Sequence, residues 1–341
     1  MKKNLLPGAL GAAAIALSLV IGGTGAIAAT TTIKIGSFTP PKAGYLRTIT
    51  IPFLRQVEKD SAGEIKFQEF WGGALIRSPR KQWEGMLNGI QDATQVLPSY
   101  TAKLFPDFGI FALPFMFEKT GTMEATIAGW RMYEKGLLGG FDKMHAFAVY
   151  TNDNSGLHLG REITSLDQIK GLKFRAPGGT EAQVVKALGG TPVGMSITQV
   201  AESINRGVIQ GTLTGWSAIS TFRITPLIKT HIDIPLGVRS FVLGMRKDLY
   251  EKLSSKGKAA IAKNSGLKLS KAFGQYYQND GESMRADPKG RSVIRPSKAE
   301  LDGIFKAHFR QFHHDWIAKV KDGQMKYDAM QAILADIRKG M

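Results

Sequence analysis

The segment Thr32-Ile-Lys-Ile-Gly-Ser37 is the first clear secondary-structure signal, and the pattern that begins with it decides the fold class. Its apolar and polar residues alternate, as they do in a half-buried β-strand. The pattern that follows predicts a helix over 46–61, a strand over 64–70, a helix over 79–89 and a strand over 92–97. Because strands that alternate with helices form parallel sheets covered by helices, the sequence predicts an α/β fold.

A second α/β set follows farther along the chain. A buried strand over 145–150 runs into the polar segment 151–156, which has no periodicity and is expected to be a hinge. The segment 241–245 is typical of a strand that returns to the first set, and helical patterns extend over 256–277 and 297–339. Between the hinge and the returning strand, strands and helices are expected over 172–175, 180–188, 191–195, 197–206 and 211–214.

Two α/β sets joined by more than one chain crossing predict a hinged clamshell of two lobes. We expect lobe I to comprise 29–152 and 240–279, and lobe II to comprise 153–239 and 280–341 with the C-terminal helices. Ligands of open α/β sheets bind beyond the carboxyl ends of the strands, and pockets favour the interfaces between domains. The ligand is therefore expected between the two lobes.

The N-terminal segment 1–28 has the three parts of a secretory signal peptide. Lys2 and Lys3 supply positive charge, the run 10–21 is apolar, and Ala26-Ile27-Ala28 has the spacing of small residues at a cleavage site. A membrane anchor is the alternative, but the apolar run is shorter than the roughly 20 residues that a membrane-spanning helix needs. We therefore expect cleavage near the end of this segment and a mature protein in the periplasm.

The composition excludes several kinds of protein. The chain has no cysteine, so neither disulfides nor thiolate metal sites are available to it. Its formal charge of +17 suggests a nucleic-acid partner, but Lys and Arg are interspersed with Asp and Glu, and no nucleic-acid motif is present. We interpret the charge as a solvated basic surface that helps to gather anionic solutes. We expect a monomer with no nucleic-acid partner.

No motif for catalysis or for a cofactor stands out. The chain lacks the Gly-x-Ser-x-Gly elbow, the P-loop, the Gly-x-Gly-x-x-Gly fingerprint and the His-Glu-x-x-His motif. His308, His313 and His314 are close in sequence, but adjacent histidines on a helix point apart, so no metal site is expected. A nucleophilic serine assembled from distant segments stays open.

The sharpest local feature is Ile169-Lys-Gly-Leu-Lys-Phe-Arg-Ala-Pro177. Leu172 and Phe174 are expected to face a core, so Lys173 and Arg175 share the opposite face of the strand. Arg175 also stands at the carboxyl end of this strand, where an α/β cleft holds its ligand. An arginine there can bind a carboxylate through two parallel hydrogen bonds, although an ordinary surface arginine is the alternative.

Four segments carry a family resemblance when they are taken together. They are Leu113-Pro-Phe-Met-Phe117, the segment 163–177, Leu188-Gly-Gly-Thr-Pro-Val-Gly-Met195 and Gly207-Val-Ile-Gln-Gly211. With them the chain resembles the solute-binding subunits of tripartite ATP-independent periplasmic (TRAP) transporters, of the DctP type, over nearly all of its mature length. The resemblance implies a class II-like periplasmic binding protein in which Arg175 binds the carboxylate of the solute. It also implies a partner made of integral membrane permease subunits, and no cofactor.

The chain departs from the family at positions that matter for the ligand. Family members often have Asp-Gly where this chain has Gln210-Gly211, and many have Asn or Glu where it has Thr214 and Trp216. Members that bind sugar acids have Glu and Arg in the segment that matches 97–100, and another Arg near Ser155. Here these positions are apolar, aromatic or small. Such a pocket would leave the hydroxyls of a sugar acid without partners.

Aromatic residues are concentrated in the segments expected to line the pocket. Core packing is the alternative for each of them, but with the missing charges they favour a monocarboxylate with a flat or apolar body, such as an aromatic or aryl-oxo acid. His158 could hydrogen-bond a hydroxyl or oxo group of the ligand, or be a hinge histidine without a role in binding. The predicted ligand-binding residues are Arg175, Thr214, Trp216, Phe38, Trp71, Tyr100, Ser155 and His158, with Tyr45 as a further aromatic neighbour.

The sequence therefore predicts a periplasmic solute-binding protein of a TRAP transporter rather than an enzyme. It captures a small organic acid anion, an aromatic or apolar monocarboxylate, and delivers it to the membrane permease. Two alternatives stay open. A ligand-sensing subunit would dock on a membrane receptor, and a periplasmic enzyme would convert small organic acids.

Overall fold

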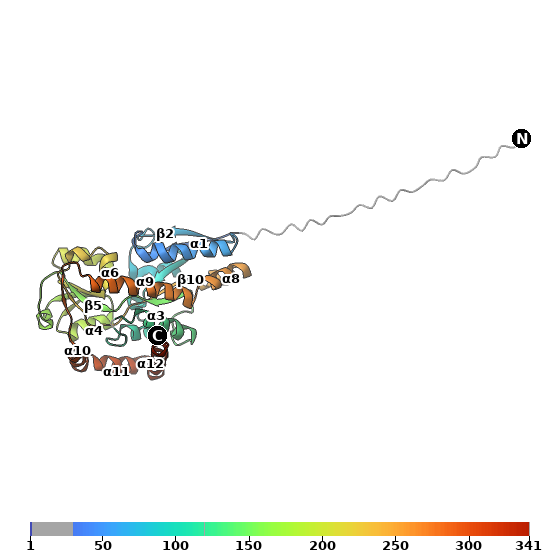
Figure 1. Ribbon diagram of the computed structural model, residues 1–341. Helices are drawn as coiled ribbons and strands as arrows, with labels where there is room; N and C mark the ends of the chain where they lie inside the picture. The colour runs from blue at the N-terminus through green and yellow to red at the C-terminus, as the bar shows by residue number, and fades with distance from the viewer. Residues whose placement is uncertain (2–29, 119, 341) are drawn as a thin grey trace.

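The computed structural model describes residue 1 and residues 30–118 and 120–340 (Figure 1). The predicted signal peptide, 1–28, lies outside the described residues apart from Met1. The described chain builds two β-sheets, each with helices packed on it, and a row of C-terminal helices. The predicted two-lobed α/β fold is thus confirmed. Within the described chain, no helix combines the length and the apolar character needed to cross a bilayer.

The first lobe is built on a five-stranded sheet with the order β2-β1-β3-β10-β4. Its strands are β1 (Thr31–Gly36), β2 (Ile65–Phe70), β3 (Ala93–Val96), β4 (Met144–Thr151) and β10 (Ser240–Arg246). β1 pairs with β2 and β3 in parallel, as the β-α-β-α-β pattern predicts. β10 returns from the second lobe and inserts antiparallel between β3 and β4, so this sheet is mixed rather than mainly parallel.

The second lobe is built on a six-stranded sheet with the order β11-β9-β5-β8-β6-β7. Its strands are β5 (Ser155–Leu159), β6 (Lys173–Ala176), β7 (Thr191–Gly194), β8 (Gly211–Gly215), β9 (Thr230–Ile232) and β11 (Ser292–Ile294). β6 runs parallel to β7 and β8, whereas β5 is antiparallel to β8 and β9. The sequence does not predict β5, β9 or β11. β9 and β11 have three residues each, and β5 is buried on both faces, so none of them shows a long alternation.

Helices cover both sheets. In the first lobe they are α1 (Ile51–Asp60), α2 (Gln82–Leu87), α3 (Thr122–Glu134), α7 (Lys247–Lys252) and α8 (Ser255–Asn264); in the second they are α4 (Gly179–Ala187), α5 (Val200–Asn205) and α6 (Trp216–Thr221). The amphipathic pattern predicted for α1 is confirmed, because its buried face carries Phe53, Leu54 and Val57.

The helix predicted over 256–277 is two helices, α8 and α9 (Leu267–Ala286). The chain turns between them at Gly266, whose φ of 87° lies in the left-handed region that favours glycine. The N–H of Gly266 donates to the carbonyl oxygen of Phe147 at 2.8 Å, which fixes the turn against β4. The apolar periodicity continues across this turn, so the sequence pattern does not reveal the break between α8 and α9.

The chain crosses between the lobes repeatedly, as predicted. One crossing is 152–154, inside the predicted hinge 151–156, and another is 233–239, between β9 and β10. α9 contacts β4 and α3 of the first lobe and α6 of the second, and it lies across both lobes in Figure 1. The lobe boundaries at residues 152, 239 and 279 stay predictions.

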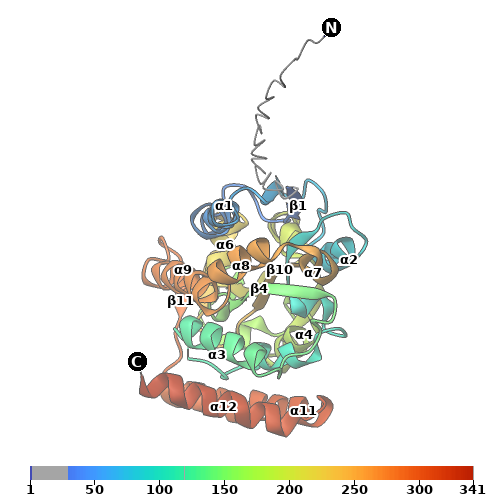
Figure 2. The ribbon, with the colours of Figure 1, turned by 90° about the vertical axis from the view of Figure 1, so that its right-hand side faces the viewer.

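The C-terminal helices also join the two lobes. They are α10 (Lys298–Ile304), α11 (Arg310–Lys319) and α12 (Gly323–Lys339), and α11 and α12 run along one side of the molecule (Figure 2). Phe309, between α10 and α11, is buried in the apolar core of the second lobe. Met330 and Leu334 of α12 are buried in the core around α3 of the first lobe.

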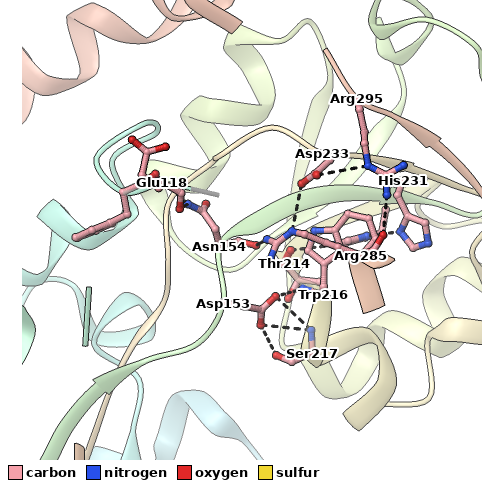
Figure 3. A network of polar contacts seen from close by, with 12 residues as sticks. Glu118, Asp153, Asn154, Thr214, Trp216, Ser217, His231, Asp233, Arg285 and Arg295 are labelled. Atoms are coloured by element: carbon pink, nitrogen blue, oxygen red, sulfur yellow. Dashed lines mark hydrogen bonds and ion pairs between the residues drawn. The ribbon is translucent and has the colours of Figure 1, made fainter. Parts of the chain in front are cut away.

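Asp153 lies in the first crossing and is buried (Figure 3). It accepts hydrogen bonds from the backbone N–H of Trp216 at 2.5 Å and from the N–H and hydroxyl groups of Ser217. It thereby caps the first turn of α6. Burial raises the pKa of Asp153, while the charge of Arg285 and these hydrogen bonds favour the ionised form. The first crossing is therefore fastened to α6 of the second lobe.

Arg285, in the last turn of α9, binds the same region from the other side (Figure 3). Its Nη2 donates to the carbonyl oxygen of Asn154 at 2.9 Å, and its Nε donates to Asp233 at 3.3 Å. Its guanidinium also lies 5.5 Å from the centre of the Trp216 ring. We call these residues the crossing network: Asp153, Asn154, Trp216, Ser217, Asp233 and Arg285.

Asp280 of α9 provides a pH-dependent test of the packing at the crossing. Its burial, and then the charge of Asp153, raise its pKa from 3.8 to about 6. The folded protein therefore holds this proton more tightly than the unfolded chain does. The stabilisation that results is complete below the unfolded pKa and is lost as the pH rises through the folded pKa. At neutral pH the carboxylate of Asp280 destabilises the fold.

We expect Asp280→Asn to raise the free energy of unfolding at pH 7.5 by about 1–2 kcal/mol, discounted because the carboxyl is partly exposed. At pH 4 the change should be close to zero. Urea denaturation at both pH values measures the difference. Asp302→Asn removes an exposed carboxylate from α10 and serves as the control. Equal effects of Asp280→Asn at the two pH values would contradict the assignment.

Candidate ligand-binding site between the lobes

A small pocket, with a cavity volume of about 40 Å³, lies between the two lobes. Residues at or just beyond the carboxyl ends of β1, β3, β6 and β8 meet there, as expected for a cleft between α/β lobes. α6, α9 and the second crossing supply the remaining walls. Six aromatic side chains and two buried arginines line it, together with Asn152, Thr214, Ser217 and Thr221.

Arg175 of β6 lies in this pocket and is 1% exposed. Its neighbour Phe174 fills the core on the opposite face of the strand, whereas Lys173 is exposed at the strand's beginning. The guanidinium of Arg175 donates to the carbonyl oxygens of Met195 (3.1 Å) and Leu213 (3.3 Å) and to the hydroxyl of Tyr100 (2.8 Å). All three partners are neutral oxygens, so these contacts orient the charge without neutralising it.

Arg239 is a second buried guanidinium, which the sequence does not predict. It ends the second crossing, lines the pocket and is 5% exposed. Its Nη2 donates to the carbonyl oxygen of Leu213 at 2.8 Å, the same oxygen that Arg175 contacts. The two guanidiniums therefore converge on one point of β8. Burial, and then the charge of Arg175, lower the pKa of Arg239 to about 10, so that it stays charged at neutral pH.

The sequence does contain a signal for Arg239. The segment Ile234-Pro-Leu-Gly-Val-Arg-Ser-Phe-Val242 is apolar on both sides of one arginine. Charged residues are rarely buried unless they have partners, so an isolated arginine in such a run indicates a specific site. Its irregular backbone gives no strand or helix pattern that would place the side chain.

Glu181 is the third buried charge. It lies in the first turn of α4 and is 3% exposed. Its Oε1 is 4.0 Å from Nε of Arg239, which is the long limit of an ion pair. The pocket region thus combines two guanidiniums with one nearby carboxylate.

The apolar walls of the pocket are aromatic. Phe38, which follows β1, is nearly parallel to Phe222 at the end of α6, with 6.2 Å between the ring centres and 10° between the planes. Tyr45, Phe241 and Tyr277 complete the wall on the side of the first lobe. The hydroxyl of Tyr45 is occupied within that lobe, and burial raises the pKa of Tyr45 to about 12. These rings offer flat apolar surface to a ligand.

Tyr100 links the two lobes beside the pocket. It belongs to the first lobe, and its hydroxyl accepts from Arg175 at 2.8 Å and from the backbone N–H of Ile197 at 3.2 Å. Arg80 stacks over the Tyr100 ring at 4.8 Å and donates to the carbonyl oxygen of Pro177 across the cleft. These contacts hold the lobes together, so exchange of a ligand requires them to separate.

The structure places the eight predicted ligand-binding residues in different surroundings. Ser155 lies just behind the pocket, where its hydroxyl accepts from Arg239 at 3.3 Å. Trp71 is half-buried in a separate small cavity of the first lobe, and its indole N–H donates to Glu69 at 2.9 Å. Four of the eight line the pocket, and their roles in binding stay predictions: Phe38, Tyr100, Arg175 and Thr214.

His158 and Trp216 are buried behind the pocket. The two Nδ1 atoms of His158 and His231 are 2.7 Å apart, Nε2 of His158 is 3.0 Å from the carbonyl oxygen of Thr214, and the ring of Trp216 stacks on His231. Burial lowers the pKa of His158 well below its usual value and that of His231 to about 4. Both rings are therefore neutral at pH 7 and add no positive charge to the site. In the described residues no cluster of three His, Cys, Asp or Glu could hold a metal ion.

Comparisons with known proteins identify the family of the chain. The family model "DctP: Bacterial extracellular solute-binding protein, family 7" matches residues 36–319. The Salmonella typhimurium protein YiiZ is 27% identical over 163 residues; the match covers 46% of this chain and 49% of YiiZ, about half the length of that relative.

Two solved structures resemble the whole two-lobed chain. A TRAP solute-binding protein from Rhodoferax ferrireducens with copurified benzoate has a TM-score of 0.83 and 24% identity, covering 91% of this chain and 99% of its own. A marine metagenome TRAP solute-binding protein specific for aromatic acids, crystallised with 3-hydroxybenzoate, has a TM-score of 0.82 and 26% identity, covering 90% of this chain and 99% of its own. The chain belongs to the DctP family of bacterial extracellular solute-binding proteins, and it is a periplasmic TRAP solute-binding protein rather than an enzyme.

Proposed function

We propose that this protein captures an aromatic monocarboxylate in the pocket between its lobes and delivers it to the membrane subunits of a TRAP transporter. One observation carries the proposal. Arg175 is a buried guanidinium with only neutral oxygen partners, and it faces a pocket that several aromatic side chains line. A buried charge without a counter-charge favours an anionic ligand.

Tyr100 supplies a further hydrogen bond to such an anion. Its hydroxyl oxygen already accepts from Arg175 and from the N–H of Ile197, which occupies both of its lone pairs. The hydroxyl proton of Tyr100 is therefore left to donate. A carboxylate bound to Arg175 would lie within reach as its acceptor. Because Tyr100 comes from the first lobe, the anion joins the two lobes.

The body of the ligand occupies the aromatic part of the pocket. Phe38, Phe222 and Phe241 offer ring faces and edges rather than hydrogen-bonding groups. Leu97 is buried and apolar where sugar-acid binders are expected to carry charge. The relatives that bind benzoate and 3-hydroxybenzoate support the same ligand class. For the hydroxyls of a sugar acid the lining offers only the neutral polar groups of Asn152, Thr214, Ser217 and Thr221, and no additional carboxylate.

We expect aromatic monocarboxylates to stabilise the protein more than C4-dicarboxylates or sialic-type sugar acids. A ligand that binds only the folded state raises Tm by mass action, so a thermal-shift screen ranks the acids and calorimetry measures their affinities. Benzoate and 3-hydroxybenzoate are the first probes, and succinate and N-acetylneuraminate are the comparisons. Binding of succinate about a hundredfold more tightly than benzoate would overturn the proposed ligand class.

Arg175 should contribute the largest single share of this affinity. Arg175→Ala leaves the buried carboxylate without its partner, at a cost of about 3–5 kcal/mol, or more than a hundredfold in Kd. Arg175→Lys should recover only part of the loss, since an ammonium cannot form two parallel hydrogen bonds.

Lys173→Ala is the matched control for this substitution. It removes an exposed positive charge two residues away on the same strand and should leave Kd unchanged. Melting curves without ligand check that each variant is folded. A folded Arg175→Ala protein that binds benzoate within about threefold of the wild type would place the anchor elsewhere.

A further inference from the structure

The three buried charges around the pocket differ in how completely they are paired. Arg175 contacts only neutral oxygens. Arg239 also donates to neutral oxygens, those of Leu213, Ser155 and Thr214, but the carboxylate of Glu181 lies 4.0 Å from its Nε. Charges in a low-dielectric site interact strongly with one another and with any ion that enters.

The atoms of Glu181 and Arg239 that face each other are not otherwise engaged. Neither Oε1 of Glu181 nor Nε of Arg239 has a hydrogen-bond partner in the structure, and both atoms are buried. Their 4.0 Å separation is too long for a direct hydrogen bond. The carboxylate therefore acts on Arg239 mainly through its charge.

The fold holds the Glu181 carboxylate in this position from its own lobe. Glu181 lies in the first turn of α4, where the helix terminus favours an anion. Its Oε2 lies close to Gly178, so closely that a Cβ there would be 2.8 Å from that oxygen. A side chain at residue 178 would displace the carboxylate, so the position of Glu181 requires a glycine here.

We propose that Glu181 sets the charge of the ligand that the pocket accepts. By offsetting Arg239 it leaves the site with one uncompensated guanidinium, that of Arg175, so the pocket takes a single carboxylate and rejects a second one. This inference rests on the proposed function and names the residue that makes the site selective for monoanions. Glu181 acts on the ligand by offsetting the charge of Arg239 and by its own negative charge. It is thus a residue that determines the specificity of the site.

The carboxylate of Asp153 does not change the number of uncompensated charges at the pocket, because other residues balance its charge. Its oxygens accept hydrogen bonds from the first turn of α6, and Arg285 of the crossing network supplies the opposing charge. Among the residues that line the pocket, a second ligand carboxylate would therefore find no further uncompensated cation, and the charge of Glu181 behind Arg239 would repel it. The repulsion acts on each negative charge of the ligand, so a dianion is penalised more than a monoanion.

Glu181→Gln tests the inference because it removes the charge and keeps the shape. Calorimetry measures Kd for benzoate, for isophthalate, which has the same ring with a second carboxylate, and for the smaller dianion succinate. In the wild type, benzoate should bind more tightly than either dianion. In Glu181→Gln the ratio of dianion Kd to benzoate Kd should fall by about tenfold or more. Glu202→Gln, which removes an exposed carboxylate from α5, should leave the ratio unchanged.

The double variant separates a charge effect from a merely structural one. Arg239→Gln alone removes a positive charge and should weaken benzoate binding. Glu181→Gln with Arg239→Gln restores the original net charge, so benzoate affinity should return to within about threefold of the wild type, together with the original ratio. If Glu181 only supports the pocket wall, the double variant should instead bind benzoate no better than the weaker single variant.

The outcomes distinguish this inference from the function on which it rests. If benzoate binds the wild type but the ratio is the same in folded Glu181→Gln, the selectivity proposal fails while the proposed function stands. If none of the three acids binds the wild type, both fail. Melting temperatures of all variants show whether a loss of binding reflects unfolding.

Discussion

A guanidinium buried between two lobes must find partners for its five N–H groups, and this requirement organises the site. Arg175 takes one partner from the segment after β7, one from β8 and one from Tyr100 of the first lobe. Arg239 shares the β8 oxygen. Tyr100 of the first lobe therefore accepts a hydrogen bond from Arg175 that the second lobe alone does not satisfy. The contact between Tyr100 and Arg175 across the cleft thus completes the surroundings of the guanidinium.

The crossing network links the two chain crossings to the helices that line the pocket. Asp153 in the first crossing caps α6, and the same helix supplies Ser217, Thr221 and Phe222 to the pocket. Arg285 holds α9 against both crossings, and α9 supplies Tyr277. A rotation about the crossings thus moves two walls of the pocket together. The crossings and the pocket therefore share helices α6 and α9.

The sequence predicts the parts of the fold that depend on local patterns. The alternation at Thr31–Gly36 and the apolar spacing of α1 are sufficient to identify those elements, and the strand that ends in Arg175 places that side chain where it lies. Arg239 escapes prediction because its position depends on an irregular crossing between two sheets. Glu181 escapes because its role comes from a 4.0 Å approach to a residue far away in sequence.

The position of Trp216 outside the pocket lining has a simple geometric cause. Thr214 faces the pocket from β8, but the chain enters α6 two residues later and turns the ring of Trp216 toward His231, away from the cleft. Sequence proximity to a pocket residue is thus a poor guide at a strand-to-helix junction.

The distribution of chemistry between the lobes explains why an acid with an apolar body suits this fold. Arg175 belongs to the second lobe and Arg239 to the second crossing, whereas Phe38 and Tyr45 belong to the first lobe. A ligand that has both an anionic and an aromatic end gives each lobe the contact it needs and stabilises their closed arrangement. A simple apolar molecule would leave Arg175 without a counter-charge, and a small hydrophilic anion would leave the rings facing it without apolar contact. The proposed aromatic acid therefore matches this arrangement of charge and rings better than either.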